Sequence, residues 1–259
     1  MRNSQGHSQN LKLSRRRVEI PSVEQVKIVD PAYGTGYFKL TSFQKTTSRD
    51  VDAALWKLHE QGMRQLIIDL RGNPGGLLKA AVEVADKFVN DGMIVATRGR
   101  SQRENFDHKG EVAGTWRVPL VVLIDRDSAS ASEILAGAIH DHRRGTVVGE
   151  KSYGKGSVQG IFPLATANVG LRLTTAKWYT PSGHAISGQG IKPDIAVAVP
   201  KPPANAASSS QGNLVTALKP TDGAKAASAT DPILAAGLQA ARTQTSSRRS
   251  VPQAGTGGQ

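Results

Sequence analysis

Short apolar runs alternate with amphipathic segments between Gly36 and Ile195, and this alternation constrains the fold more than any other feature of the chain. Strands are expected at 37–40, 65–70, 93–97, 120–124, 146–148, 158–164 and 170–176, the last two as a pair. Helices are expected at 47–58, 77–90 and 130–140, and a long polar loop at 98–116. Strands that alternate with helices indicate an α/β core with a largely parallel sheet.

A chain of 259 residues has room for one core with appendages. We expect a basic N-terminal segment at 1–20, the core at 21–200 and a low-complexity tail at 201–259. The tail is rich in Ala, Ser, Pro and Gly, which predicts a disordered segment that adds little to burial. Within it, 231–241 predicts a short helix capped by Asp231, with Pro232 in its first turn.

Composition excludes several classes of protein. The chain has no cysteine, which rules out disulfides, thiolate metal sites and a cysteine nucleophile. No apolar run reaches the roughly 18 residues that a transmembrane helix needs, and no export signal is visible in residues 1–10. The net charge is +12, but residues 1–20 and 201–259 each carry +4, which leaves only +4 for the 180 residues between them. Specific nucleic-acid binding is therefore not expected.

The first candidate site is the serine-rich segment 125–133, which lies between an expected buried strand and an expected helix. A hydroxyl at such a junction is exposed, and the next amide lies at the positive end of a helix. Ser130 is therefore a candidate nucleophile, and the Ala131 N–H is a candidate donor to an oxyanion. Taken alone, the segment fits an ordinary helix cap better, and it lacks the Gly-x-Ser-x-Gly pattern of a nucleophile elbow.

The second candidate site is the glycine-rich segment 149–159. Its spacing approaches that of a phosphate-binding loop, but Gly156 stands where such a loop needs Ser or Thr, and a strand is expected to follow instead of a helix. The nucleotide-binding interpretation therefore fails. Flanking glycines allow a tight turn that directs Lys155 inward, where burial favours a neutral amine able to act as a base. A flexible solvated turn is the alternative for this segment alone.

Together these segments resemble the C-terminal processing, or tail-specific, peptidases from about residue 36 to residue 195. Five stretches occur in the family's order: Gly-Tyr-Phe-Lys-Leu, Asp-Leu-Arg-Gly-Asn-Pro-Gly-Gly-Leu-Leu, Ser-Ala-Ser-Ala-Ser-Glu-Ile, Val-Val-Gly-Glu-Lys-Ser-Tyr-Gly-Lys-Gly-Ser-Val-Gln and Leu-Thr-Thr-Ala-Lys-Trp-Tyr-Thr-Pro-Ser-Gly. The resemblance implies a core of crotonase- and Clp-protease-like β/α layers with a mainly parallel sheet.

The resemblance, rather than the spacing, assigns the catalytic roles. Ser130 takes the place of the nucleophile, and Lys155, 25 residues later, takes that of the general base in a Ser–Lys dyad. Gln159 matches the residue that orients the lysine. The implied activity is that of a serine endopeptidase that cleaves polypeptides near their C-termini through an acyl-enzyme, without a metal or organic cofactor.

The remaining site residues follow from the same resemblance. The second oxyanion amide would come from the Gly75-Gly76 turn, where we favour Gly76, with Ala131 giving the first. Asp141 matches a family aspartate that we interpret as support for the dyad. A histidine base or a metal site is not expected, because no acid is placed to form a triad and the pair His140 and His142 points apart on a helix.

One departure concerns substrate capture. Family members usually carry a PDZ domain and an export signal before the core, whereas residues 11–20 resemble at most the last strand of a PDZ domain and its exit linker. The chain is either a fragment, or has an unusual start, or has lost that module. For a fragment, the resemblance implies a cell-envelope, periplasmic or other extracytoplasmic site. The rival hypothesis is a catalytically weak or inactive peptide-binding scaffold. Polypeptides are the expected partners in both cases, and the sequence does not indicate an oligomeric state.

Overall fold

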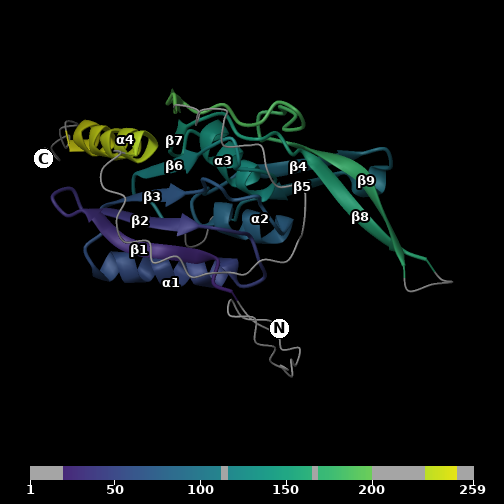
Figure 1. The fold of residues 1–259 in the computed structure, drawn as a ribbon, viewed down its shortest axis with the longest axis horizontal. Coiled ribbons are helices and arrows are strands. Elements are labelled where there is room, and N and C mark those ends of the chain that lie inside the picture. The colour runs from purple at the N-terminus through teal and green to yellow at the C-terminus, as the bar shows by residue number, and fades with distance from the viewer. Residues whose placement is uncertain (1–19, 112–115, 165–168, 200–230, 250–259) are drawn as a thin grey trace, which may run out of the picture.

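The computed structural model describes residues 20–111, 116–164, 169–199 and 231–249, with the backbone alone for 245–249. One sheet has six strands in the order β1-β2-β3-β6-β7-β10 (Figure 1). Their bounds are Val23–Asp30, Thr35–Leu40, Gln65–Asp69, Leu120–Ile124, Thr146–Gly149 and Ile195–Ala196. Only β1 and β2 run antiparallel, and the other neighbours are parallel. The expected α/β class with a mainly parallel sheet is confirmed.

A second sheet has the order β5-β4-β9-β8 and is antiparallel. Its strands span Phe106–Lys109, Met93–Gly99, Gly170–Tyr179 and Ser157–Pro163. The expected pairing of β8 with β9 is confirmed, and this hairpin projects from the body of the molecule (Figure 1). The expectation of one long loop at 98–116 is wrong, because it contains β5 and the short 3-10 helix Gln102–Glu104. As an edge strand, β5 exposes nearly all its side chains, so it shows no apolar pattern.

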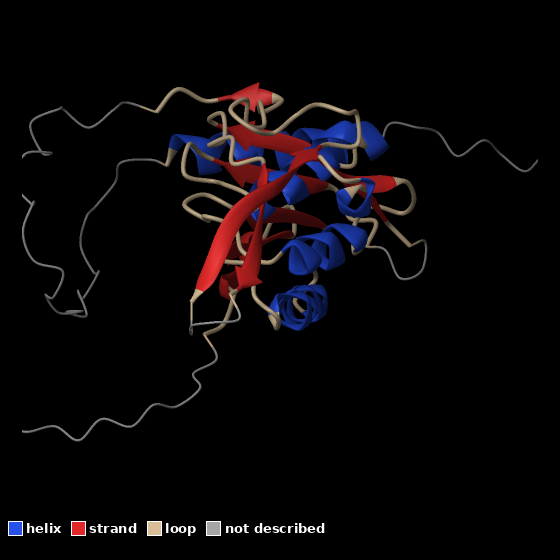
Figure 2. Ribbon diagram, turned by 90° about the vertical axis from the view of Figure 1, so that its right-hand side faces the viewer, coloured by secondary structure: helices blue, strands red, loops and turns tan. Residues whose placement is uncertain are grey.

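Helices cover the six-stranded sheet on both faces, and Figure 2 shows them on either side of the strands. Helices α1 (Thr47–Glu60), α2 (Leu78–Asp86) and α3 (Ala131–Asp141) pack on one face. Side chains alternate along a strand, so Leu66 and Ile68 join this first core, whereas Ile67 points to the other face.

The C-terminal helix α4 (Pro232–Arg249) covers that second face. Its predicted cap is confirmed, since the Leu234 N–H donates to Asp231 Oδ1 at 3.0 Å. The helix is longer than expected, and its Ile233 and Ala241 are buried against residues such as Val121. The expectation that the tail adds little to burial is therefore wrong for α4, although residues 201–230 and 250–259 lie outside the described part. None of the described helices is long and apolar enough to span a membrane.

Candidate active site

Ser130 occupies the junction between β6 and α3 in an unusual backbone conformation. Its φ is 58° and its ψ is −113°, a region in which non-glycine residues are strained by about 1–3 kcal/mol. A sharp strand-to-helix turn of this kind is typical of a serine nucleophile. The elbow geometry is thus present without the glycines of the Gly-x-Ser-x-Gly pattern. In place of those neighbours, a glycine from another part of the chain makes room for the turn.

That glycine belongs to the loop that follows β3, residues 71–76, which we call the glycine loop. Gly75 has φ +100°, and a Cβ there would lie 2.7 Å from Ser130 Cβ and 2.8 Å from the Ala131 nitrogen. A Cβ on Gly76, with φ +148°, would meet the Phe43 carbonyl. Any side chain at Gly75 would therefore collide with the serine turn and obstruct the Ala131 amide.

The amides around Ser130 differ in their availability. The Gly75 N–H donates to Asn73 Oδ1 at 2.8 Å and is therefore engaged. In the part of the chain that the structure describes, the N–H groups of Gly76 and Ala131 make no hydrogen bond. This difference favours Gly76 over Gly75 as the partner of Ala131 in an oxyanion hole.

Asn73 joins the glycine loop to the serine turn, and it was not among the candidates from the sequence. It is fully buried. Its side-chain NH₂ group donates to the Leu40 carbonyl at 2.8 Å. Its backbone carbonyl accepts hydrogen bonds from the Ala129 N–H and from the Ser132 hydroxyl, both at 3.0 Å. The two turns therefore share one buried anchor, which sequence periodicity does not indicate.

Glu133 joins the serine turn to the segment that carries Lys155, and it was also missed. Its carboxylate is fully buried. One oxygen accepts from the N–H groups of Ser130 and Lys155, both at 2.8 Å. The other accepts from the Ser152 hydroxyl and the Gly154 N–H, both at 2.6 Å. A signal was present in the sequence, because Ser130-x-x-Glu133 fits the pattern of a capping box.

Lys155 reaches the neighbourhood of Ser130 through its backbone, but its side chain does not follow the expectation of burial. The residue is exposed, and among the described residues its amine makes no hydrogen bond or ion pair. Gln159 donates to Thr174 Oγ1 at 2.8 Å, and among the described residues it makes no hydrogen bond to Lys155. A register shift between Val158 and Gln159 accompanies this arrangement, since Gln159 pairs with Thr174 on the exposed hairpin.

Asp141 lies at the far end of α3 from Ser130, about 16 Å away along the helix axis. Its carboxylate accepts from the Ser182 N–H at 2.9 Å and from the Ser182 hydroxyl, and it contacts His140 Nδ1 at 2.8 Å. Burial by itself raises the pKa of Asp141, but hydrogen bonds from Ser182, Thr180 and His140 lower it by more. The pKa of Asp141 therefore lies below its ordinary value. Asp141 therefore ties α3 to the turn after β9 and makes no contact with the candidate dyad.

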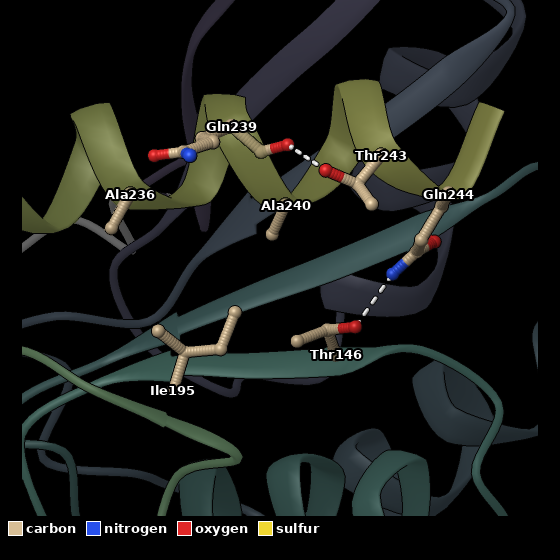
Figure 3. A pocket seen from close by; sticks show the side chains of 7 residues that line it. All are labelled: Thr146, Ile195, Ala236, Gln239, Ala240, Thr243 and Gln244. Atoms are coloured by element: carbon tan, nitrogen blue, oxygen red, sulfur yellow. Dashed lines mark hydrogen bonds between the residues drawn. The ribbon is translucent and has the colours of Figure 1, made fainter. Parts of the chain in front are cut away.

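The site contains no group of metal ligands: no cluster of three His, Cys, Asp or Glu side chains suited to a metal occurs among the described residues. Among the described residues, several cavities have neither Ser130 nor Lys155 in their lining. One, of about 410 Å³, lies between α4 and the edge of the sheet, with Thr146 and Ile195 on one side and Gln244 on the other (Figure 3). Another, of about 530 Å³, lies beside Asp141.

The sequence of this chain is similar to those of known proteases. The chain is 51% identical over 174 residues to a carboxy-terminal-processing protease of Bartonella bacilliformis, covering 64% of this chain and 39% of that protein. It is 42% identical over 194 residues to a carboxyl-terminal-processing protease of Synechocystis sp., covering 74% and 45%. The chain therefore spans less than half the length of these two relatives.

Solved structures agree with the sequence relatives. The photosystem II D1 C-terminal processing protease superposes with a TM-score of 0.61 at 33% identity, over 72% of this chain and 51% of that one. An S41 protease from Bacteroides fragilis, at 18% identity and a TM-score of 0.57, shares the fold over 70% of this chain and 52% of its own. The sequence model of peptidase family S41 matches residues 34–197, which is more than half of the chain. On these grounds the chain belongs to peptidase family S41.

Proposed function

We propose that this chain is the proteolytic core of a serine endopeptidase that cleaves polypeptides near their C-termini, with Ser130 as nucleophile and Lys155 as general base. The observation that carries the proposal is the strained turn at Ser130, where φ is 58°. The N–H groups of Gly76 and Ala131 lie at this turn, and no described group accepts a hydrogen bond from either of them. The relatives named carboxy-terminal-processing proteases support the choice of substrate end.

The reaction would use four groups of this chain. The Lys155 amine takes the proton of the Ser130 hydroxyl while Oγ attacks the peptide carbonyl carbon. The Ala131 and Gly76 N–H groups stabilise the oxyanion, and protonated Lys155 returns its proton to the departing amine. Water then hydrolyses the acyl-enzyme, with Lys155 again as the base. No step needs a metal or an organic cofactor.

The reaction requires two side chains, those of Lys155 and Gln159, to leave their described positions. The Lys155 side chain is exposed, so its flexible four-carbon stem must turn toward Ser130 before catalysis. Its backbone need not move, because the buried Glu133 carboxylate already holds the Lys155 and Ser130 N–H groups at 2.8 Å each. We infer that Gln159 exchanges its bond to Thr174 for one to Lys155 in that state.

The test is labelling and turnover. A fluorophosphonate should label Ser130 of the wild type, and Lys155→Ala and Lys155→Arg should abolish peptide hydrolysis while the fold remains, because arginine does not deprotonate near neutral pH. Lys151→Ala is the control, since Lys151 is an exposed lysine of the same segment. Activity should survive EDTA. An active Lys155→Ala enzyme, or loss of activity with EDTA, contradicts the mechanism.

A second function is a peptide-binding scaffold that retains the protease fold. The observation that favours it is the outward Lys155 with Gln159 bound elsewhere. Unlabelled, folded protein that still binds peptides would support the scaffold and contradict the peptidase.

A further inference from the structure

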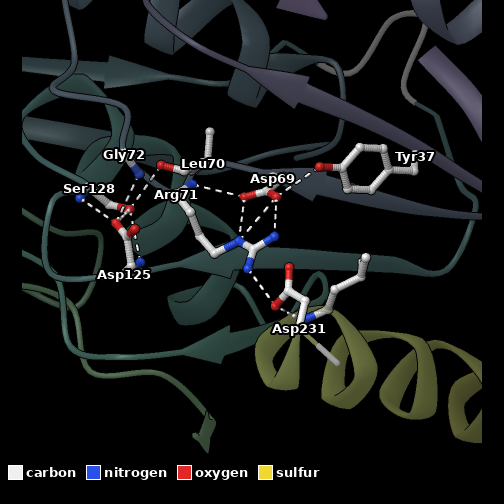
Figure 4. Close-up of polar contacts among 9 residues, drawn as sticks. Tyr37, Asp69, Leu70, Arg71, Gly72, Asp125, Ser128 and Asp231 are labelled. Atoms are coloured by element: carbon white, nitrogen blue, oxygen red, sulfur yellow. Dashed lines mark hydrogen bonds and ion pairs between the residues drawn. The ribbon is translucent and has the colours of Figure 1, made fainter. Parts of the chain in front are cut away.

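The glycine loop begins at an arginine that also touches the C-terminal helix. Arg71 Nη1 donates to Asp231 Oδ1 at 2.7 Å, and the same oxygen caps α4 through the Leu234 N–H (Figure 4). On its other side the guanidinium donates to Asp69 at the end of β3, with its shortest bond at 2.6 Å. One side chain therefore links β3 and the glycine loop to α4, although Arg71 and Asp231 are 160 residues apart in the sequence.

Two carboxylates hold the first two residues of the glycine loop, ahead of the buried anchor Asn73. The Arg71 N–H donates to Asp69 Oδ1 at 2.9 Å, and the Gly72 N–H donates to Asp125 Oδ1 at 3.0 Å. Asp125 directly follows β6, the strand beside β3, and it accepts a hydrogen bond from the Ser128 N–H in the serine turn (Figure 4). From Gly72 only three residues lead to Gly76, so a shift of Arg71 would move the loop relative to the serine turn.

The contact between α4 and Arg71 is partly exposed to water and borders a cavity of about 400 Å³. The Arg71 side chain is 19% exposed and that of Asp231 is 39% exposed. Burial raises the pKa of Asp231, but the Leu234 N–H and the Arg71 guanidinium lower it by more. The pKa of Asp231 therefore lies below its ordinary value. Asp231 is therefore ionised near neutral pH and attracts Arg71 as a full charge.

The same helix carries a second ion pair that does not involve the glycine loop. Arg242 contacts Asp30, at the end of β1, with its closest nitrogen 2.8 Å away. Arg242 follows Asp231 by 11 residues, or about 16 Å of helix. This pair anchors α4 at a distance from Ser130, and it serves as a built-in control for effects of helix docking alone.

We propose that Arg71 is a positioning residue for the glycine loop, and that α4 fixes it through Asp231, so that the Gly76 amide meets the oxyanion only when α4 is docked. This inference rests on the proposed peptidase function, in which Gly76 touches the reacting carbonyl. It assigns α4 a role in the reaction besides covering the sheet.

The experiment compares variants of the whole chain. Asp231→Ser keeps a good helix cap but removes the charge, and Asp231→Asn keeps the shape as well. Arg242→Ala removes the ion pair with Asp30 and the cation–π contact with Tyr33, and it leaves the Arg71–Asp231 contact in place. The readouts are the single-turnover acylation rate constant with an activated ester, the apparent affinity for that ester, and the amide NMR shifts of Gly75 and Gly76. Urea unfolding of each variant measures stability.

We expect Asp231→Ser to slow acylation about tenfold or more at unchanged ester affinity, equivalent to about 1.4 kcal/mol or more of barrier, and to shift the Gly75 and Gly76 signals. Asp231→Asn should lie between it and the wild type, and Asp231→Glu, which keeps the charge, should restore most of the rate. Arg242→Ala should lose comparable stability while acylation and both signals stay unchanged.

The outcomes separate this inference from the proposed function. Equal effects of Asp231→Ser and Arg242→Ala, or unchanged rate and signals in Asp231→Ser, overturn the positioning role. If the wild type is not acylated at all, the proposed function fails, whereas Gly75 and Gly76 shifts specific to Asp231→Ser still support the link between α4 and the loop.

Discussion

Replacing Glu133 with glutamine changes one oxygen of a fully buried carboxylate into an NH₂ group with almost no change of shape. Every partner of this carboxylate is a donor: the N–H groups of Ser130 and Lys155 on one oxygen, and the Ser152 hydroxyl with the Gly154 N–H on the other. Whichever way the amide turns, two donors lose their acceptor and face another donor.

The size of the effect follows from those contacts. A buried donor left without an acceptor costs about 1–3 kcal/mol, so two cost about 2–6 kcal/mol. The total stability of a typical domain is about 5–15 kcal/mol, so the loss should be large but compatible with a folded protein for much of that range. Catalysis should suffer as well, because the backbones of Ser130 and Lys155 depend on the same carboxylate.

The assay combines urea unfolding, followed by intrinsic fluorescence, with the rate of fluorophosphonate labelling at Ser130. Glu150→Gln is the matched control, since Glu150 precedes Lys151 in the same segment but pairs with the exposed Arg126. We expect little change in the control and a fall of both quantities in Glu133→Gln. A Glu133→Gln protein as stable as the control and labelled at the wild-type rate would refute the reasoning.

Three further substitutions test other contacts. Gly75→Ala should abolish acylation and destabilise the fold, because the new Cβ would lie 2.7 Å from Ser130 Cβ. The control Gly62→Ala, at φ +81° with no atom within 4 Å of its Cβ, should cost only backbone strain. Equal effects of the two variants in chemical denaturation would contradict this. Ile233→Ala should lower the free energy of unfolding by about 2–4 kcal/mol because Ile233 is 3% exposed under α4, and the exposed Gln239→Ala should change it little; a match between the two would show that α4 is not docked. Asp141→Asn tests a pH dependence: the folded pKa of Asp141 lies below its unfolded value, so its contribution to stability is complete above the ordinary aspartate pKa of about 3.9 and disappears as pH falls through the folded pKa. The difference in thermal midpoint between wild type and Asp141→Asn should thus shrink in acid, and a difference that grows there would contradict the sign.

Most of the core elements, and the place of Ser130 between a strand and a helix, could be predicted from the sequence, because both depend on local patterns. Apolar runs such as 120–124 mark buried strands by their composition alone. The junction of such a strand with a helix is a local pattern, and it is enough to place Ser130 in the connecting turn. The edge strands β1, β5 and β10 were missed because many of their side chains face water and leave no continuous apolar run.

The contacts that complete the candidate site depend on residues far apart in the sequence. Glu133 binds Gly154, 21 residues later, and Gly75 gives Ser130 the space for its strained turn. Periodicity in the sequence does not reveal such pairs, because the two partners come together only when the chain folds.

The sequence by itself determined an α/β core, with a serine at a strand–helix junction and a lysine in a glycine-rich turn. Only the tertiary structure decided that α4 closes the second face of the sheet and that Asp231 reaches Arg71. The physical reason is that a helix of small apolar residues is marginal alone and is stabilised by the surface on which it packs. That surface, which includes Ile67 and Val121, exists only once the strands have aligned.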